Sequence, residues 1–172
     1  FEFEAEASFH TALDGPFIED VKMEFKVEDG LLHYKYESEG LPFGEVVTVW
    51  LGGFNQPDSC EGSGPLADGG GQCGLTDWIS PNTYATTQIM WKNAGAAVIG
   101  PDGELEFEGV DDLNVSTEFG PQLDVETAEI QIWVRTHGLP IPGRLDEQLS
   151  HSQGGCDVNT CVDLQIAVIP AP

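Results

Sequence analysis

The sequence predicts an all-β fold, an antiparallel β-sandwich of the Greek-key or jelly-roll type with about eight or nine strands. Three observations support this prediction. Apolar and polar residues alternate with a period of two along much of the chain, turn residues separate the alternating segments, and no helix of substantial length is recognisable. A length of 172 residues fits one domain over residues 1–172, because such a chain can bury a full core and no linker-like segment divides it.

The first third of the chain contains three alternating segments. The odd residues from Phe1 to Phe9 are apolar and the even ones are mostly acidic, and the same alternation recurs from Val21 to Val27. Asp29 and Gly30 then predict a two-residue hairpin turn, because both residue types tolerate positive φ. The apolar residues of the expected return strand are Leu32, Tyr34 and Tyr36.

The remainder of the chain alternates between strands and long loops. Residues 46–51 are apolar on both faces, which predicts a central strand, whereas residues 55–82 are rich in Gly, Pro, Ser and Asp and predict a loop. A second long loop over residues 139–154 is expected to contain one helical turn at residues 145–149. The other expected strands lie near residues 86–91, 96–99, 105–107, 128–134 and 162–168.

The four cysteines fall in two close pairs, and four cysteines allow three pairings. Local loop closure favours Cys60–Cys73 and Cys156–Cys161. The alternative is a zinc site, but neither pair has the C-x₂-C spacing and no His-x₃₋₅-His accompanies them. Two disulfides predict an oxidising compartment, and therefore a secreted protein outside the cell or at its surface.

The charge balance narrows the classes of partner. Lys and Arg total 6 against 30 acidic residues, a formal net charge of -24. Such a surface excludes nucleic acid and repels anionic membranes, while cations, Ca²⁺ above all, remain possible ligands. No apolar run approaches the roughly 18 residues of a membrane span, and a chain that begins at Phe1 rather than Met predicts a processed N-terminus. The acids considered for Ca²⁺ are Asp68, Asp77, Asp111, Asp112, Asp124 and Glu126.

A polar segment that follows a strong strand contains the first candidate site, Arg135 with His137. Arg135 is one of two arginines in this acidic chain, so we expect a carboxylate partner, with Asp77, Glu129 and Asp163 as candidates. One interpretation is that Arg135 and its carboxylate partner form a structural ion pair that fixes the loop. The other is that Arg135 and His137 belong to a binding or catalytic site. A metal-assisted enzyme centred on His137 and Arg135 is one hypothesis, although no nucleophile motif is present.

Two tryptophans form the second candidate site. Trp133 lies on the strand face opposite Ile130 and Ile132, and Trp78 follows the first long loop. Such residues are either covered by loops or exposed, and an exposed indole stacks on a sugar ring or fills a partner's pocket. Trp78 and Trp133 are therefore candidate contacts for a glycan.

Several short motifs resemble those of a family of secreted bacterial β-proteins with no established activity. The resemblance spans residues 41–169 and rests on FNQPDSC at 54–60, CGLTD at 73–77, AEI at 128–130, VRTHG at 134–138, Gln148, GGC at 154–156 and CVDLQ at 161–165. It implies export and the two local disulfides. It also implies one polar cluster, and a His is frequent in the family where this chain has Gln131. The implied cluster comprises Asp77, Arg135, His137, Gln148 and Asp163.

Three functional hypotheses follow from these patterns. The first is a non-enzymatic structural or binding domain at the cell surface that assembles with itself into a filament by exchanging its N-terminal strand, residues 1–9. The second is a binding module for carbohydrate or Ca²⁺ that uses Trp78, Trp133 and loop acids. The third is the metal-assisted enzyme at His137 and Arg135.

Overall fold

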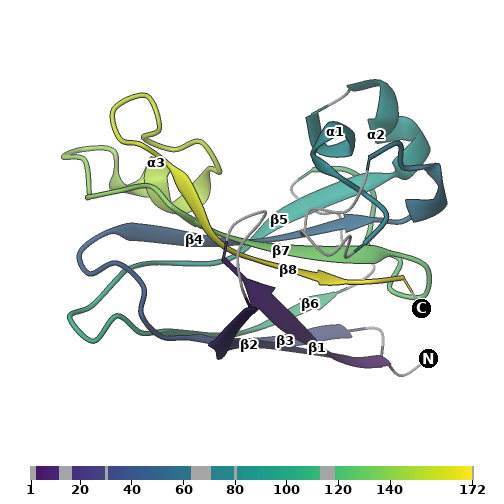
Figure 1. Ribbon diagram of the computed structural model, residues 1–172, viewed down its shortest axis with the longest axis horizontal. Coiled ribbons are helices and arrows are strands. Elements are labelled where there is room, and N and C mark those ends of the chain that lie inside the picture. The colour runs from purple at the N-terminus through teal and green to yellow at the C-terminus, as the bar shows by residue number, and fades with distance from the viewer. Residues whose placement is uncertain are drawn as a thin grey trace.

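The computed structural model describes residues 3–11, 17–29, 31–62, 71–79, 81–112 and 119–171; Phe1, Gly30 and Asp68 lie outside these ranges. In the described part of the chain, eight strands alternate with a few short helices (Figure 1). The strands are β1 (Phe3–His10), β2 (Phe17–Glu28), β3 (Leu31–Ser38), β4 (Val46–Phe54), β5 (Ile89–Val98), β6 (Leu105–Asp112), β7 (Glu129–Thr136) and β8 (Val162–Ile169). The helices are η1 (Pro57–Ser59), α1 (Leu75–Ile79), α2 (Pro81–Thr87) and α3 (Leu145–Ser150).

All eight strands belong to one antiparallel sheet in the order β5-β4-β7-β8-β1-β2-β3-β6. The sheet folds over itself around the core until its edge strands, β5 and β6, contact each other (Figure 1). The predicted all-β class and the predicted number of antiparallel strands are confirmed for the described residues, but the arrangement is not clearly a sandwich, because the sheet is nearly closed like a barrel. The cause is β1, which pairs with β2 along its length and with β8 at Phe9 and His10 and so joins the two layers.

The alternating residues form the core as predicted. Ile130, Ile132 and Val134 of β7 are at most 1% exposed and pack in the main hydrophobic cluster, whereas Trp133 lies on the opposite face. All nine residues of β4 are buried. This confirms the predicted central strand, because the inner face of β4 contacts the core and its outer face lies beneath loops and helices.

The N-terminal strand is paired within its own chain. Its register with β2 runs from Phe3 opposite Val27 to His10 opposite Phe17. The hairpin between β2 and β3 has the predicted position, because Glu28 pairs with Leu31 and only residues 29 and 30 lie between them.

Two caps rise from the same outer side of the sheet, toward opposite ends of it (Figure 1). The helical cap comprises residues 57–62, 71–79 and 81–87 with η1, α1 and α2, and the C-terminal cap comprises residues 138–161 with α3. The loop predicted over residues 55–82 is thus partly helical, and β5 begins at Ile89 rather than near Thr86. These helices are too short to show a 3.6-residue period in the sequence. Among the described residues, no helix is long and apolar enough to cross a membrane.

Candidate functional site

The helical cap is held together by a disulfide and by one buried carboxylate. Cys60 and Cys73 are bonded, as predicted. Asp77 is fully buried, and its carboxylate joins the two arms that the disulfide connects. It accepts hydrogen bonds from the backbone N–H groups of Glu61 at 2.9 Å, Gly62 at 3.0 Å and Gly74 at 2.8 Å. Asp77 therefore has a structural role here.

A second polar group fixes the cap to the sheet. The Gln131 amide of β7 donates to Glu129 Oε1 at 2.7 Å and to the Cys73 carbonyl at 2.9 Å, and its oxygen accepts from Trp78 Nε1 at 2.8 Å. Burial raises the pKa of the Glu129 carboxyl, although the backbone N–H groups of residues 72 and 73 and the Gln131 amide act in the opposite direction. Gln131 thus sets the orientation of the Trp78 indole.

The Trp78 indole packs against β4 at Gly52, where the strand has no side chain. A Cβ added to Gly52 would lie 2.1 Å from Cη2 of Trp78, so only glycine leaves room for this indole. The Trp78 ring contacts Trp91 at a centroid distance of 5.7 Å and Trp133 at 6.3 Å. Phe54 packs edge-on against it at 5.1 Å.

All four tryptophans of the chain line one cleft between the two caps. Its volume is about 290 Å³, and the other lining residues are Arg135, Ser152, Gln153 and Asp163. The strand register explains the convergence, because Trp50 of β4 lies opposite Trp133 of β7 and Gly52 lies opposite Trp91 of β5. We name this feature the tryptophan cleft.

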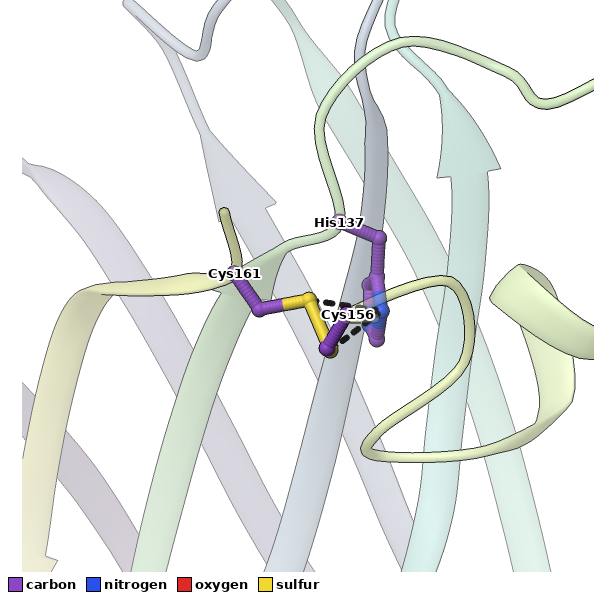
Figure 2. Close-up of side chains that lie close together, drawn as sticks. All are labelled: His137, Cys156 and Cys161. Atoms are coloured by element: carbon purple, nitrogen blue, oxygen red, sulfur yellow. Dashed lines mark hydrogen bonds between the residues drawn. A yellow bond between two sulfur atoms is a disulfide. The ribbon is translucent and has the colours of Figure 1, made fainter. Parts of the chain in front are cut away.

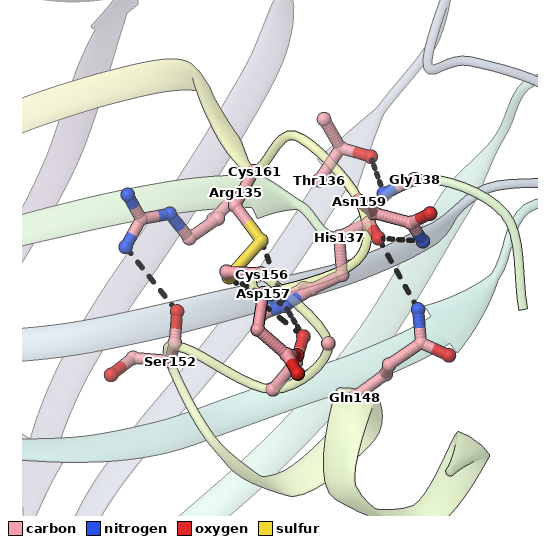
Figure 3. Close-up of a disulfide and its surroundings, with 12 residues drawn as sticks. Arg135, Thr136, His137, Gly138, Gln148, Ser152, Cys156, Asp157, Asn159 and Cys161 are labelled. Carbon is pink, nitrogen blue, oxygen red and sulfur yellow. Dashed lines mark hydrogen bonds between the residues drawn. A yellow bond between two sulfur atoms is a disulfide. The ribbon is translucent and has the colours of Figure 1, made fainter. Parts of the chain in front are cut away.

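Arg135 and Asp163 form an ion pair in the lining of the cleft. Arg135 Nε lies 3.0 Å from Asp163 Oδ1, although its N–H is not aligned for a hydrogen bond, and Nη1 donates to the Ser152 carbonyl at 3.3 Å (Figure 3). Of the three predicted carboxylate partners, Asp163 is the one observed. Burial raises the pKa of the Asp163 carboxyl, and the nearby Arg135 charge only partly offsets this effect.

His137 is fully buried at the base of the C-terminal cap, and both ring nitrogens have partners. Trp50 Nε1 donates to Thr48 Oγ1 at 2.8 Å, so the Thr48 hydroxyl is free to donate to His137 Nε2, also at 2.8 Å. Nδ1 lies 2.8 Å from the Gly154 carbonyl, which can only accept. The Gly154 contact places a proton on Nδ1, the Thr48 contact is compatible with an unprotonated Nε2, and burial favours this neutral imidazole.

The second disulfide, Cys156–Cys161, packs against this imidazole, as Figure 2 shows. Its sulfurs lie 4.0 and 3.7 Å from His137 Nδ1. Among the described residues, these three are the one group of three His, Cys, Asp or Glu side chains whose donor atoms converge. Bonded sulfurs lack the thiolate charge that binds metals, and Nδ1 carries a proton. The cluster therefore holds the loop in place rather than presenting a metal-binding face.

The remaining predicted residues are divided between the caps. The Gln148 amide donates to the His137 carbonyl, as Figure 3 shows. It also donates to the Leu139 carbonyl and accepts from the Ile141 N–H. The structure thus places Arg135, His137, Gln148 and Asp163 at the C-terminal cap and Asp77 in the helical cap. The predicted cluster of five is brought together only in part. Within the described ranges, no three acidic side chains converge on one point.

A buried neutral histidine makes stability depend on pH. Burial lowers the pKa of His137 below its usual 6.5, so the unfolded chain binds the proton more tightly than the folded one. The contribution of His137 to stability is therefore complete above the pKa that this histidine has in the unfolded chain, and it is lost as the pH falls from about 7 to about 5. Glu129 and Asp163 act in the opposite direction, because their raised pKa values favour folding as the pH falls.

We expect the difference in free energy of unfolding between the wild type and His137→Gln to shrink steadily over this pH range. Both proteins retain Glu129 and Asp163, so the direct contributions of these two carboxyl groups largely cancel in the difference. Urea unfolding at a series of pH values measures it. A constant difference would contradict the assignment of a neutral imidazole.

Comparisons with protein-family models, with curated proteins and with solved structures gave no significant match to this chain. The resemblance to secreted bacterial β-proteins therefore remains a prediction from the motifs.

Proposed function

We propose that this protein is a non-enzymatic carbohydrate-binding module whose ligand occupies the tryptophan cleft. The observation that carries the proposal is the convergence of all four tryptophans, from β4, α1, β5 and β7, on one cleft. Aromatic side chains offer large apolar faces, and the C–H faces of sugar rings stack on such surfaces. Because the cleft lies between two caps on a rigid sheet, the aromatic rings are ordered before a ligand arrives.

The composition of the lining also fits a small polar ligand with apolar faces. Binding pockets are mostly apolar with a few placed polar groups, and their volumes start at about 300 Å³. The tryptophan cleft, at about 290 Å³, matches the lower end of that range. Its polar groups are Arg135, Ser152, Gln153 and Asp163.

The structure favours this function over filament assembly by strand exchange. In the sheet order, β1 lies between β2 and β8, so it has a hydrogen-bonded neighbour from its own chain on each side. Exchange would break the register from Phe3 to His10. The two disulfides are compatible with an extracellular protein, the setting in which we place the module.

Replacing Trp133 by alanine is expected to weaken binding of the cognate saccharide by about thirtyfold or more, since truncating a central tryptophan removes about 2 kcal/mol or more. Glycan-array screening identifies the saccharide, and fluorescence titration measures its affinity. Trp133→Phe retains an aromatic face and should bind with intermediate affinity. Phe43→Ala, at an aromatic residue that is 69% exposed and does not line the cleft, serves as the control. The proposal fails if no saccharide binds, or if Trp133→Ala binds as tightly as the wild type.

A further inference from the structure

We infer that the tryptophan cleft selects neutral sugars, and that Arg135 and Asp163 determine this specificity by binding two adjacent hydroxyl groups of one sugar ring. The inference rests on the proposed carbohydrate-binding function and names the class of saccharide. It follows from the position, the free bonding capacity and the charge of the pair.

The pair lies directly beside the aromatic surface. Arg135 is two residues beyond Trp133 on the same face of β7, and Asp163 of β8 is its cross-strand partner. Both side chains line the cleft together with the tryptophans. A ring stacked on the indoles therefore directs its edge, where the hydroxyl groups lie, toward this ion pair.

Both members of the pair retain bonding capacity. A guanidinium has five N–H donors and a carboxylate has about four acceptor positions. Within the described part of the chain, Arg135 donates to the Ser152 carbonyl, and Asp163 makes its one contact with Arg135 Nε. The two side chains are 22% and 25% exposed. A hydroxyl group both donates and accepts a hydrogen bond. Of two neighbouring sugar hydroxyls, one can therefore donate to the Asp163 carboxylate while the other accepts from the Arg135 guanidinium.

The charges favour a neutral ligand. An acidic sugar would place a second carboxylate beside Asp163, in the field of a chain with a formal net charge of -24. Burial already raises the pKa of the Asp163 carboxyl, so that position is poorly solvated for negative charge. A cationic ligand, which the tryptophan faces and the net negative charge attract, would meet the local repulsion of the Arg135 guanidinium. A neutral polyol avoids both penalties.

The first test compares ligands of three charges on the full chain. Isothermal titration and tryptophan fluorescence would be measured with neutral hexose disaccharides, with the corresponding uronic-acid disaccharides and with choline. We expect a neutral disaccharide to bind, its uronic-acid counterpart to bind about tenfold more weakly or worse, and choline not to compete. A uronic-acid disaccharide that binds as tightly would overturn the inference while leaving the carbohydrate-binding function intact. If choline binds and no saccharide does, both the inference and the proposed carbohydrate-binding function are overturned.

The second test assigns the specificity to the pair. Asp163→Asn and Arg135→Gln should each lower the affinity for the neutral disaccharide by about tenfold to a hundredfold, since each removes a charge-assisted hydrogen bond. The matched controls are Asp157→Asn and Arg144→Gln, which remove the members of an ion pair within the C-terminal cap, 2.9 Å apart. Neither control residue lines the cleft, so binding should be unchanged.

A readout of specificity separates recognition from a loss of structure. Asp163→Asn should bind the uronic-acid disaccharide more tightly relative to the neutral one than the wild type does, because the repelling charge is gone. A monodeoxy analogue that lacks the hydroxyl contacted by Asp163 should bind the wild type more weakly than the parent disaccharide does. The same analogue should bind Asp163→Asn as tightly as the parent disaccharide does. An unchanged ratio of affinities, or an equal loss with every deoxy analogue in both proteins, would show that the pair acts on the fold alone and would overturn the inference.

Discussion

Replacing Asp77 by alanine is expected to lower the free energy of unfolding by about 3–5 kcal/mol, a large effect for one substitution. The Asp77 carboxylate is fully buried and accepts three backbone hydrogen bonds, from residues 61, 62 and 74. Alanine removes the acceptor of a buried N–H group at Gly74 and of partly buried N–H groups at residues 61 and 62, and each buried donor without a partner costs about 1–3 kcal/mol. Urea unfolding at neutral pH, with the disulfides intact, measures the loss.

Two control variants define the origin of this effect. Asp77→Asn retains one oxygen acceptor and should lose less stability than alanine. Asp58→Ala, at an exposed acid of the same cap, should change stability by no more than about 0.5 kcal/mol. If Asp77→Ala unfolds at the same urea concentration as Asp58→Ala, the carboxylate does not hold the arms of the disulfide loop together.

Replacing Gly52 by alanine is expected to displace Trp78 and to abolish measurable binding in the tryptophan cleft. The added Cβ would lie 2.1 Å from the indole, well inside van der Waals contact. The indole cannot move freely, because Phe54, Trp91 and Trp133 pack around it. Overpacking of this kind costs about 1–3 kcal/mol. Near-ultraviolet circular dichroism, which reports the packing of the neighbouring indoles, should change together with the loss of ligand binding.

A double-mutant cycle identifies the clash as the cause. In a Trp78→Ala background the methyl group of Gly52→Ala has room, so the cost of the second substitution should largely disappear. If the free-energy costs of Gly52→Ala and Trp78→Ala simply add, the backbone rather than the indole requires glycine at this position.

The sequence predicted the strands and the covalent links well. Alternation placed Ile130, Ile132 and Val134 in the core and Trp133 on the other face, and the structure confirms both. Local spacing predicted the two disulfides, because short loops close readily. The near-closure of the sheet could not be predicted, since it depends on Phe9 and His10 of β1 pairing with β8, more than 150 residues further along the chain.

The candidate site was found only in part. Trp78, Trp133, Arg135 and Asp163 were singled out from the sequence, and the structure places all four in the cleft lining. Trp50 was missed because its strand is apolar on both faces and shows no alternation, and Trp91 was missed because it lies at a position with no distinctive motif. Gly52 carries the signal that could have helped, since a glycine inside a strand often marks the close approach of another group.

The caps described above have a consequence for how the cleft can change. Each disulfide closes within one cap, Cys60–Cys73 in the helical cap and Cys156–Cys161 in the C-terminal cap, and neither crosses the cleft. The two walls are therefore cross-linked independently of each other above the same strands. Substitutions in one wall can reshape its side of the cleft while the opposite wall and the strands beneath keep their structure. This architecture lets the lining of the cleft diverge without a new fold.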